Sequence, residues 1–572
     1  MVRQSKAGNP DLHKVARERF GYRELRPMQE EAVRLLMGGR DVLSIMPTGS
    51  GKSAIYQLAG VVIPGYTVVI SPLIALQKDQ VDAIAEMDLP NAAVLNARLH
   101  AGERREVFEK LRAGELEFLL LSPEQMANEE TYGHLKERPP TLLVVDEAHC
   151  VSEWGHDFRP DYARLGAMME GLRGKPRRAK QRAPVLALTA TATPAVRQDI
   201  VAALRMNDAR VLVSGFDRPN IFLAVEECPD DMIKFHRLLF HLRQEGALPA
   251  IVYAATHQGT EELAEALRKN EIAALAYHGG MKREERDAAQ DAFMGGDRQA
   301  EVIVATNAFG MGVDKADVRL VVHYYPPDSL DSYYQEIGRA GRDGKPARAV
   351  MLFREEDLGL RKAISTPGRV KKAEVEKVVE AVEEAARTGS AGALDVSTLA
   401  EETELGKRKV VSTLAHLAAA GGVEVTATGK VKAGNTEDAE ELVEAVVEEQ
   451  EQHRAARVAR MELVRDYAMT RRCRRAYVLT YFGEPAGTTC TACDNCAAGI
   501  SARAEALEEA KGAMSGESRP FAEKTRVVHE TFGPGLVMGY DGEEVEVLFD
   551  TGGPRRLNVA YVRAHRLLRT EG

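Results

Sequence analysis

The sequence lacks a long apolar run, an N-terminal signal and an excess of positive charge. No apolar run approaches the roughly 20 residues that a membrane-spanning helix needs, so we expect no membrane span. No apolar stretch follows the N-terminal Met-Val-Arg-Gln-Ser-Lys, which predicts no secretory signal and a cytoplasmic location. The net charge is −10, which excludes a protein that holds nucleic acid by bulk charge alone. Any contact with nucleic acid must therefore be local.

The size of the chain predicts several domains. With 572 residues it is too long for a single hydrophobic core. Its composition, 44% hydrophobic and 28% charged, is that of a globular protein.

A glycine-rich loop is the first functional signature. The run Met46-Pro47-Thr48-Gly49-Ser50-Gly51-Lys52-Ser53 lies between an apolar stretch and a helix-like one, which predicts strand, loop and helix. Glycines let the backbone N–H groups turn onto phosphate oxygens, and the helix N-terminus adds its positive dipole end. Lys52 is expected to reach the β- and γ-phosphates, and Ser53 to ligate Mg²⁺. We therefore predict a nucleotide site at Thr48, Gly49, Ser50, Gly51, Lys52 and Ser53.

Two adjacent carboxylates form the second signature. The apolar run Leu142 to Val145 reads as a buried parallel strand and leads directly into Asp146 and Glu147. Open parallel sheets bind ligands at the carboxyl ends of their strands. We expect Asp146 to hold Mg²⁺ through water and Glu147 to polarise the attacking water, so that the chain hydrolyses a nucleoside triphosphate.

The segment ahead of the glycine loop points to one family. Residues 20–32 read F-G-Y-R-E-L-R-P-M-Q-E-E-A and resemble the adenine-reading segment of RecQ helicases. Gln29 is the adenine reader that this resemblance implies, because an amide can both donate and accept on one base edge. Tyr22 and Arg26 are expected to stack on or flank the base, with packing of the N-terminal helix as the alternative.

The only tryptophan lies in a loop that resembles the aromatic-rich loop of the same family. Residues 150–162 read C-V-S-E-W-G-H-D-F-R-P-D-Y. Trp154, Phe158 and Arg159 offer flat faces on which unpaired DNA bases can stack beside the hydrolytic carboxylates. A buried aromatic anchor is the alternative, which the polar residues interleaved through the loop disfavour.

Later motifs resemble the second motor domain of RecQ helicases. Residues 188–192 (L-T-A-T-A) look like the motif that relays the nucleotide state to that domain, and Y-Y-Q-E-I-G-R-A-G-R-D-G covers residues 333–344. Arg339 and Arg342 are three residues apart, which suits one face of a helical turn. We expect them to neutralise charge on the transferring γ-phosphoryl group, with Gln335 orienting water or phosphate beside them.

Four cysteines have the spacing of a metal site. The pattern C-x16-C-x2-C-x2-C offers four thiolates to one tetrahedral ion, and a reducing compartment disfavours disulfides. The surrounding residues resemble the RecQ zinc module, which implies Zn²⁺, with an iron–sulfur cluster as the chemical rival. The expected ligands are Cys473, Cys490, Cys493 and Cys496.

Two other segments depart from the usual RecQ arrangement. Residues 395–425 resemble a winged helix, although in most relatives that module follows the cysteines; a small helical spacer is the alternative. Residues 521–572 alternate with period two between glycine turns, which predicts a small β-barrel. This segment resembles the Tudor-like tail of UvrD/PcrA helicases, which implies docking to RNA polymerase or a repair protein, centred on the strand edges and on Arg555 and Arg556. A nucleic-acid-binding barrel is the competing interpretation.

Together these patterns predict an α/β protein with two tandem RecA-like domains, a winged-helix-like segment, a helical zinc module and a small C-terminal β-barrel. The resemblance implies a 3′ to 5′ ATP-dependent helicase, monomeric and nucleoid-associated, acting on single-stranded and branched DNA in repair and recombination. An RNA helicase and a scaffold with a silent ATPase are the rivals. The expected domains are 1–216 (ATP-binding), 217–356 (second RecA-like), 357–434 (winged-helix-like), 435–500 (long helix and zinc), 501–520 (linker) and 521–572 (barrel).

Overall fold

A computed structural model describes most of the chain. The chain divides into two compact units, and each is described by itself. The first holds residues up to Tyr325 together with Asp331–Phe353 and Arg471–Glu505, and the second holds the remainder. The described residues are 10–72, 92–96, 99–152, 162, 165–173, 182–295, 300–310, 315–365, 371–388, 394–425, 431–434, 439–504, 520–522, 525–529, 532–541, 544–550, 553–564 and 567–570.

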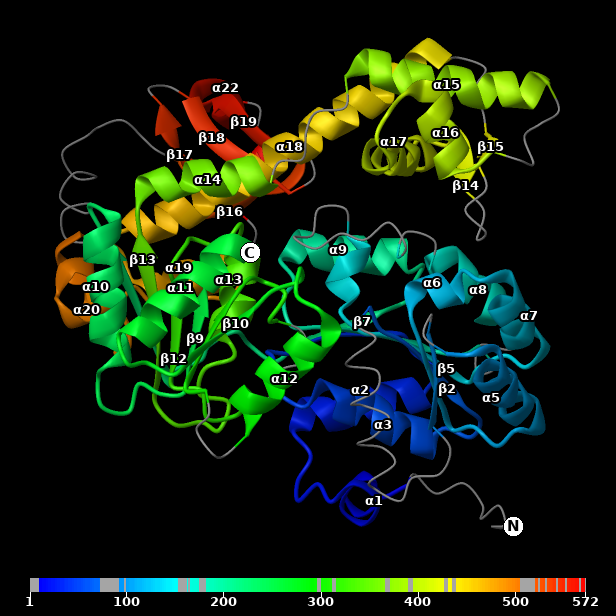
Figure 1. Ribbon diagram of the computed structural model, residues 1–572, viewed down its shortest axis with the longest axis horizontal. Coiled ribbons are helices and arrows are strands. Elements are labelled where there is room, and N and C mark those ends of the chain that lie inside the picture. Colours follow the sequence, from blue (N-terminus) through cyan, green and yellow to red (C-terminus); the bar gives the residue numbers. More distant parts are fainter. Residues whose placement is uncertain are drawn as a thin grey trace. The chain divides into compact units, whose positions relative to one another are not determined.

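The first lobe of unit one is a seven-stranded parallel sheet in the order β3-β4-β2-β5-β6-β1-β7. Its central strands are apolar and buried. Helices lie on either side of the sheet (Figure 1), as a parallel sheet with two apolar faces requires. The strands are β1 Val42–Ile45, β2 Thr67–Ile70, β3 Ala92–Leu95, β4 Phe118–Leu121, β5 Leu142–Val145, β6 Val185–Thr189 and β7 Arg210–Val213. The helices are α1 Leu12–Phe20, α2 Pro27–Met37, α3 Lys52–Val62, α5 Ala101–Ala113, α6 Pro123–Met126, α7 Glu129–Glu137, α8 Leu165–Arg173 and α9 Pro194–Ala203, with a 3-10 turn at Ala148–Val151.

The second lobe is a six-stranded parallel sheet in the order β10-β11-β9-β12-β13-β8. The strands are β8 Ile221–Glu227, β9 Ala250–Tyr253, β10 Ala274–Tyr277, β11 Val302–Ala305, β12 Leu320–His323 and β13 Ala347–Phe353. The helices are α10 Asp231–Leu242, α11 His257–Lys269, α12 Arg283–Met294 and α13 Leu330–Ile337. Two RecA-like sheets in tandem confirm that part of the predicted fold.

The cysteine-bearing segment packs on the second lobe. It contains the helices α19 Arg474–Tyr481 and α20 Asp494–Ala497. The backbone N–H of Leu223 donates to the carbonyl of Ala492 at 3.1 Å, and the N–H of Val225 donates to the Asp494 carboxylate at 2.9 Å. The edge strand β8 is therefore covered by this segment over Leu223 and Val225.

The second unit begins with helices. These are α14 Glu355–Ser365, α15 Lys372–Arg387, α16 Val396–Thr403, α17 Lys407–Ala419 and α18 Ala439–Met469. An antiparallel hairpin of β14 Val423–Val425 and β15 Val431–Ala433 follows α17. One apolar core joins α15, α16, α17, the hairpin and the start of α18, so the segment 371–447 buries its own hydrophobic side chains.

The C-terminal segment is a five-stranded antiparallel sheet in the order β19-β18-β17-β16-β20. Its strands are β16 Arg526–His529, β17 Gly533–Asp541, β18 Glu544–Phe549, β19 Gly553–Asn558 and β20 Leu568–Thr570, with a short helix α22 Val559–Ala564. Among the described residues no ladder joins β19 to β20, so these two strands form the edges of the sheet there. A closed barrel remains a prediction.

No described helix is both long enough and apolar enough to span a bilayer.

Candidate nucleotide site and zinc centre

The glycine loop joins β1 to α3 as the sequence predicts. Gly49 and Gly51 have positive φ angles of 76° and 81°, a conformation that glycine adopts at little cost. Gly51 is the N-cap of α3, so the N-terminal N–H groups of this helix open onto the loop. Lys52 and Ser53, both half-buried, start the helix. This arrangement provides backbone donors and a helix dipole for an anion.

The predicted adenine-reading residues lie beside this loop. The Gln29 side-chain amide accepts from the Arg26 backbone N–H at 2.9 Å and donates to the Gly51 carbonyl at 2.9 Å. The Tyr22 hydroxyl donates to Gln57 at 2.8 Å, and its ring stacks on Phe20. Gln29 thus braces the phosphate loop.

The acidic pair lies at the carboxyl end of β5. Asp146 is buried, and its carboxylate accepts from the backbone N–H of Glu147 at 3.0 Å. Glu147 has φ 48° and ψ 48°, a left-handed conformation that costs a non-glycine residue about 1–3 kcal/mol. The His149 ring lies 3.4 Å from the Glu147 carboxylate and 2.9 Å from the Thr189 hydroxyl. His149 therefore links Thr189 on the neighbouring strand β6 to the surroundings of the Glu147 carboxylate.

A chain of hydrogen bonds runs on from Thr189 to the second lobe. The Thr189 hydroxyl donates to the carbonyl of Thr191 at 3.0 Å. The Gln335 side chain, from α13, donates to the Thr191 hydroxyl at 2.9 Å. Sequence reasoning identified the segment 188–192 and Gln335 separately but not their contact, because 144 residues separate the partners.

The two predicted arginines follow α13 rather than lying on a helix. The helix ends at Ile337, and Arg339 and Arg342 lie in successive turns, so the expectation of one helical face is wrong. Flanking glycines explain this: Gly341 and Gly344 have positive φ angles of 56° and 80°. We call residues 338–345 the arginine turn.

The arginine turn faces the phosphate loop of the first lobe. A Cβ built on Gly49 would lie 3.0 Å from Cδ of Arg342, so this side chain packs directly on the loop. Arg339 is buried beside Tyr253 and Gly310. Burial raises the pKa of Tyr253 to about 12, and the nearby Arg339 guanidinium opposes that shift. The phosphate loop and the arginine turn thus form one site from two lobes.

The predicted DNA-stacking residues Trp154, Phe158 and Arg159 lie outside the described residues.

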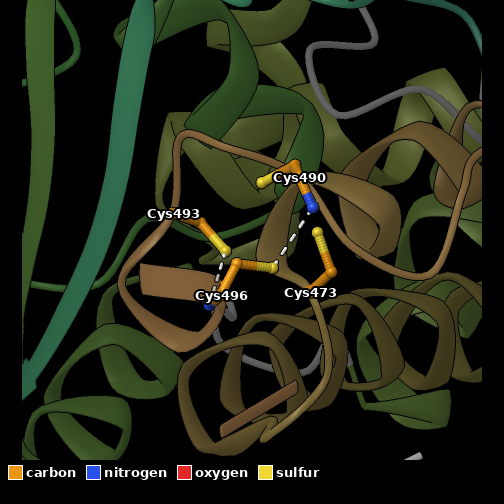
Figure 2. A group of neighbouring side chains, drawn as sticks. All are labelled: Cys473, Cys490, Cys493 and Cys496. Carbon is orange, nitrogen blue, oxygen red and sulfur yellow. Dashed lines mark hydrogen bonds between the residues drawn. The ribbon is translucent and has the colours of Figure 1, made fainter. Parts of the chain in front are cut away.

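The four predicted cysteines form one cluster (Figure 2). Their sulfur atoms all lie within 4.8 Å of one another, and tetrahedral Zn–S bonds of about 2.3 Å need sulfur atoms roughly 3.8 Å apart. Backbone N–H groups of Cys490 and Cys496 donate to the sulfurs of Cys496 and Cys493. The hydrogen bond between the Cys473 and Cys493 thiols lowers the pKa of Cys493 and raises the pKa of Cys473, so the two thiols share a proton in the absence of an ion. These features fit a thiolate-bound ion.

The cysteine segment also contacts the segment between the lobes, which sequence reasoning did not foresee. Phe482 stacks on Phe216 with ring centroids 4.4 Å apart, and Tyr334 packs edge-on against both. Arg197 of the first lobe donates to the Phe482 carbonyl at 2.8 Å. Glu484 accepts from the Phe216 backbone N–H at 2.5 Å. The aromatic pair Tyr481-Phe482 beside the first cysteine is the signal that could have indicated this contact.

The fold and the site define a class of protein. One RecA-like lobe carries a phosphate loop and a strand that is followed by Asp-Glu, and the second lobe adds two arginines. These are the features of a two-lobed helicase driven by a nucleoside triphosphate. Family models agree: residues 26–200 match the DEAD/DEAH box helicase model, and residues 233–344 match the helicase conserved C-terminal domain. Residues 435–497 match the RecQ zinc-binding model, which favours zinc over an iron–sulfur cluster.

Curated relatives define the family. The chain is 40% identical over 365 residues to a probable ATP-dependent DNA helicase RecS of Bacillus subtilis, covering 64% of this chain and 71% of that protein. It is 41% identical over 346 residues to the ATP-dependent DNA helicase RecQ of Pasteurella multocida, covering 60% of this chain and 52% of that protein. The chain belongs to the RecQ family of ATP-dependent DNA helicases. It spans only about half the length of the RecQ proteins that it matches.

Among solved structures, the helicase MrfA bound to DNA shares the fold at 19% identity. The TM-score is 0.50, covering 60% of this chain and 51% of that chain.

Proposed function

We propose that the chain is an ATP-dependent 3′ to 5′ DNA helicase that translocates on single-stranded DNA and unwinds duplex or branched DNA in repair and recombination. The observation that carries this proposal is the packing of Arg342 from the second lobe on the phosphate loop of the first. A nucleotide bound there touches both lobes, so its hydrolysis changes how the lobes contact one another. That coupling is what a translocating motor needs.

The first lobe supplies the hydrolytic groups. Lys52 binds the β- and γ-phosphates, and the backbone N–H groups of residues 48–53 surround them. Ser53 and Asp146 hold Mg²⁺, which supplies charge neutralisation on the phosphates. Glu147 polarises the attacking water, and its left-handed backbone is a strained conformation of the kind found at active sites.

The second lobe supplies positive charge to the transition state. Arg342 and Arg339 stabilise charge on the transferring phosphoryl group, and Gln335 orients water or phosphate. Gln29, with Tyr22 and Arg26 beside it, reads adenine once its amide leaves the Gly51 carbonyl.

We assign the contact with DNA to Trp154, Phe158 and Arg159. Their flat side chains stack against unpaired bases. They follow Glu147 closely in sequence, which supports a direct influence of bound DNA on hydrolysis. An RNA helicase shares most motor motifs, but the RecQ family assignment favours DNA. A scaffold with a silent ATPase is disfavoured because Lys52 and Glu147 are both present.

The test is ATP hydrolysis with and without single-stranded DNA, in the wild type, Lys52→Ala and Trp154→Ala. We expect DNA to stimulate wild-type turnover, Lys52→Ala to abolish it, and Trp154→Ala to lose only the stimulation. Single-stranded RNA of equal length is the competitor. Stimulation by RNA alone would favour the RNA helicase, and a wild type without turnover would favour the scaffold.

Residues 395–425, within the expected domain 357–434, are proposed to form a winged helix that contacts duplex DNA. Two helices, α16 and α17, followed by an antiparallel pair of strands, support this. Deletion of residues 371–434 should lower affinity for duplex but not for single-stranded DNA. Unchanged duplex affinity would favour a helical spacer.

The C-terminal sheet is proposed to be a Tudor-like barrel that docks RNA polymerase or a repair protein. Arg555 packs over the Phe532 ring at 4.3 Å, and both Arg555 and Arg556 are exposed, which supports a polar docking face. The test is retention of such a partner by the full chain but not by a variant lacking residues 521–572. If the truncation loses only DNA affinity, the segment binds nucleic acid. We further propose a monomer located at the nucleoid in the cytoplasm.

A further inference from the structure

The arginine turn is held by two side chains from the segment between the lobes. This interlobe segment, residues 214–220, connects β7 to β8. The Arg218 guanidinium donates to the backbone carbonyls of Gly338, Ala340 and Gly341 at 3.2, 2.9 and 3.3 Å. Its donors thus bind the backbone immediately before and after Arg339.

Asn220 holds the other side of the same turn. Its side-chain N–H group donates to the carbonyls of Gly341 and Lys345 at 2.8 and 3.0 Å. A Cβ at Gly341 would lie 2.5 Å from this nitrogen, and the φ of Gly341 is 56°. Only glycine therefore lets the turn approach Asn220 closely, one residue before Arg342.

The interlobe segment is itself anchored on the zinc module. Arg475, on α19, forms an ion pair with Asp217 and donates to the carbonyl of Ile221 at 2.7 Å. Arg218 and Asn220 lie between these two anchored residues. The backbone that carries them is therefore fixed from outside both lobes.

We propose that Arg218 and Asn220 are positioning residues for Arg339 and Arg342. They act through the backbone, because their side chains donate to the carbonyls of the turn from which the two guanidinium groups would reach the γ-phosphate. This inference rests on the proposed ATPase function and adds residues that the helicase motifs do not contain. Displacement of a catalytic group by about 1 Å is enough to lower turnover about 100-fold.

The test measures kcat and KM for DNA-stimulated ATP hydrolysis in Arg218→Ala, Arg218→Lys and Asn220→Asp. We expect kcat to fall about 10- to 100-fold while KM for ATP stays near the wild-type value, since ground-state binding is untouched. Arg218→Lys should recover little, because an ammonium group cannot donate to three carbonyls in a plane.

Matched controls come from the same lobe. Arg268 donates to the Ala274 carbonyl and Asn270 to the Ala266 carbonyl, both away from the arginine turn. Arg268→Ala and Asn270→Asp should lose comparable thermal stability and keep wild-type kcat. Equal kcat losses in control and test variants would overturn the proposal.

A double-mutant cycle separates positioning from general damage. Arg218→Ala should lower kcat strongly in the wild-type background but barely in the Arg342→Ala background. Turnover is measured with enzyme in excess, so that the low residual activity can be detected. Fully additive losses would overturn the proposal. If Arg218→Ala does not fold, the nearly isosteric Asn220→Asp takes its place in the cycle. A wild type without DNA-stimulated turnover would instead refute the proposed function itself.

Discussion

Gln335 donates its side-chain N–H to the hydroxyl of Thr191 at 2.9 Å, which joins the second lobe to the first. Thr191 in turn offers its carbonyl to Thr189, which contacts His149 beside Glu147. Hydrogen bonds thus run from Gln335 of the second lobe to His149 of the first, whose ring lies 3.4 Å from the Glu147 carboxylate. We expect this chain to link the contact between the lobes to the group proposed to polarise water.

Breaking this link should uncouple nucleotide from DNA. Thr191→Val and Gln335→Ala remove the hydrogen bond, and we expect the change in single-stranded DNA affinity caused by a non-hydrolysable ATP analogue to shrink. In coupled sites the two affinities, with and without the analogue, commonly differ by about 5- to 150-fold. In the variants we expect the ratio of these two affinities to approach one. Both DNA affinities are measured by fluorescence anisotropy, with and without the analogue. The control is Gln258→Ala, which breaks only a surface bond to Glu262; an unchanged ratio in Gln335→Ala would contradict the link.

The buried ion pair of Asp41 and Arg173 should contribute strongly to stability. Both side chains are almost fully buried, 2.5 Å apart, and Asp41 also accepts from the backbone N–H groups of Val185 and Asn207. Asp41→Ala leaves a buried guanidinium uncompensated, which costs about 3–5 kcal/mol. Urea unfolding of the first lobe measures the loss.

An exposed pair in the same lobe is the control. Arg40 and Asp208 are 2.7 Å apart, with Asp208 84% exposed, so Asp208→Ala should cost less than about 1 kcal/mol. Equal losses in the two variants would show that burial does not set the energy of these pairs.

Local motifs predicted the strands, the loop and the helix around the first lobe's candidate site correctly, because the geometry of such motifs is set by neighbouring residues. The phosphate loop needs only strand β1, a turn through Gly51 and helix α3 in sequence order. Asp146 needs only to follow strand β5 directly. The cysteines too are close in sequence. By contrast, Arg197 and Phe482 are 285 residues apart, and no periodicity indicates such a pair.

Helical spacing misled where glycine sets the backbone. Arg339 and Arg342 have the separation of a helical turn, yet Gly341 in the left-handed region ends any helix there. Similarly, period-two alternation identified strands in residues 521–572 but not whether their edges close, since closure depends on stagger between distant strands.

Loss of zinc should destabilise the second lobe as well as the cysteine segment. The hydrogen bonds of Leu223 to Ala492 and of Val225 to Asp494 depend on the fold around the ion. Cys493→Ser should lower the zinc content from one ion to near zero per chain, and it should lower the Tm of the protein. Metal analysis and calorimetry measure these two effects. Cys228→Ser, at a buried cysteine outside the cluster, should keep its zinc; if it also lost the metal, the ligand assignment would be wrong.

Gln29 should determine base selectivity. Gln29→Glu removes the donor needed for adenine and places a carboxylate near the Gly51 carbonyl, so we expect KM for ATP to rise about tenfold, the effect of one lost hydrogen bond. The preference for ATP over GTP should fall by a similar factor, measured by steady-state kinetics. Unchanged discrimination would assign Gln29 a purely structural role in the loop.

The most direct test of the central claim is strand separation on a duplex with one single-stranded tail. The chain is incubated with ATP and Mg²⁺ on matched duplexes carrying either a 3′ or a 5′ tail, and Glu147→Gln is the inactive control. The account predicts ATP-dependent unwinding of the 3′-tailed duplex, little of the 5′-tailed one and none by Glu147→Gln. Failure to unwind either duplex while hydrolysing ATP, or equal unwinding by Glu147→Gln, would contradict it.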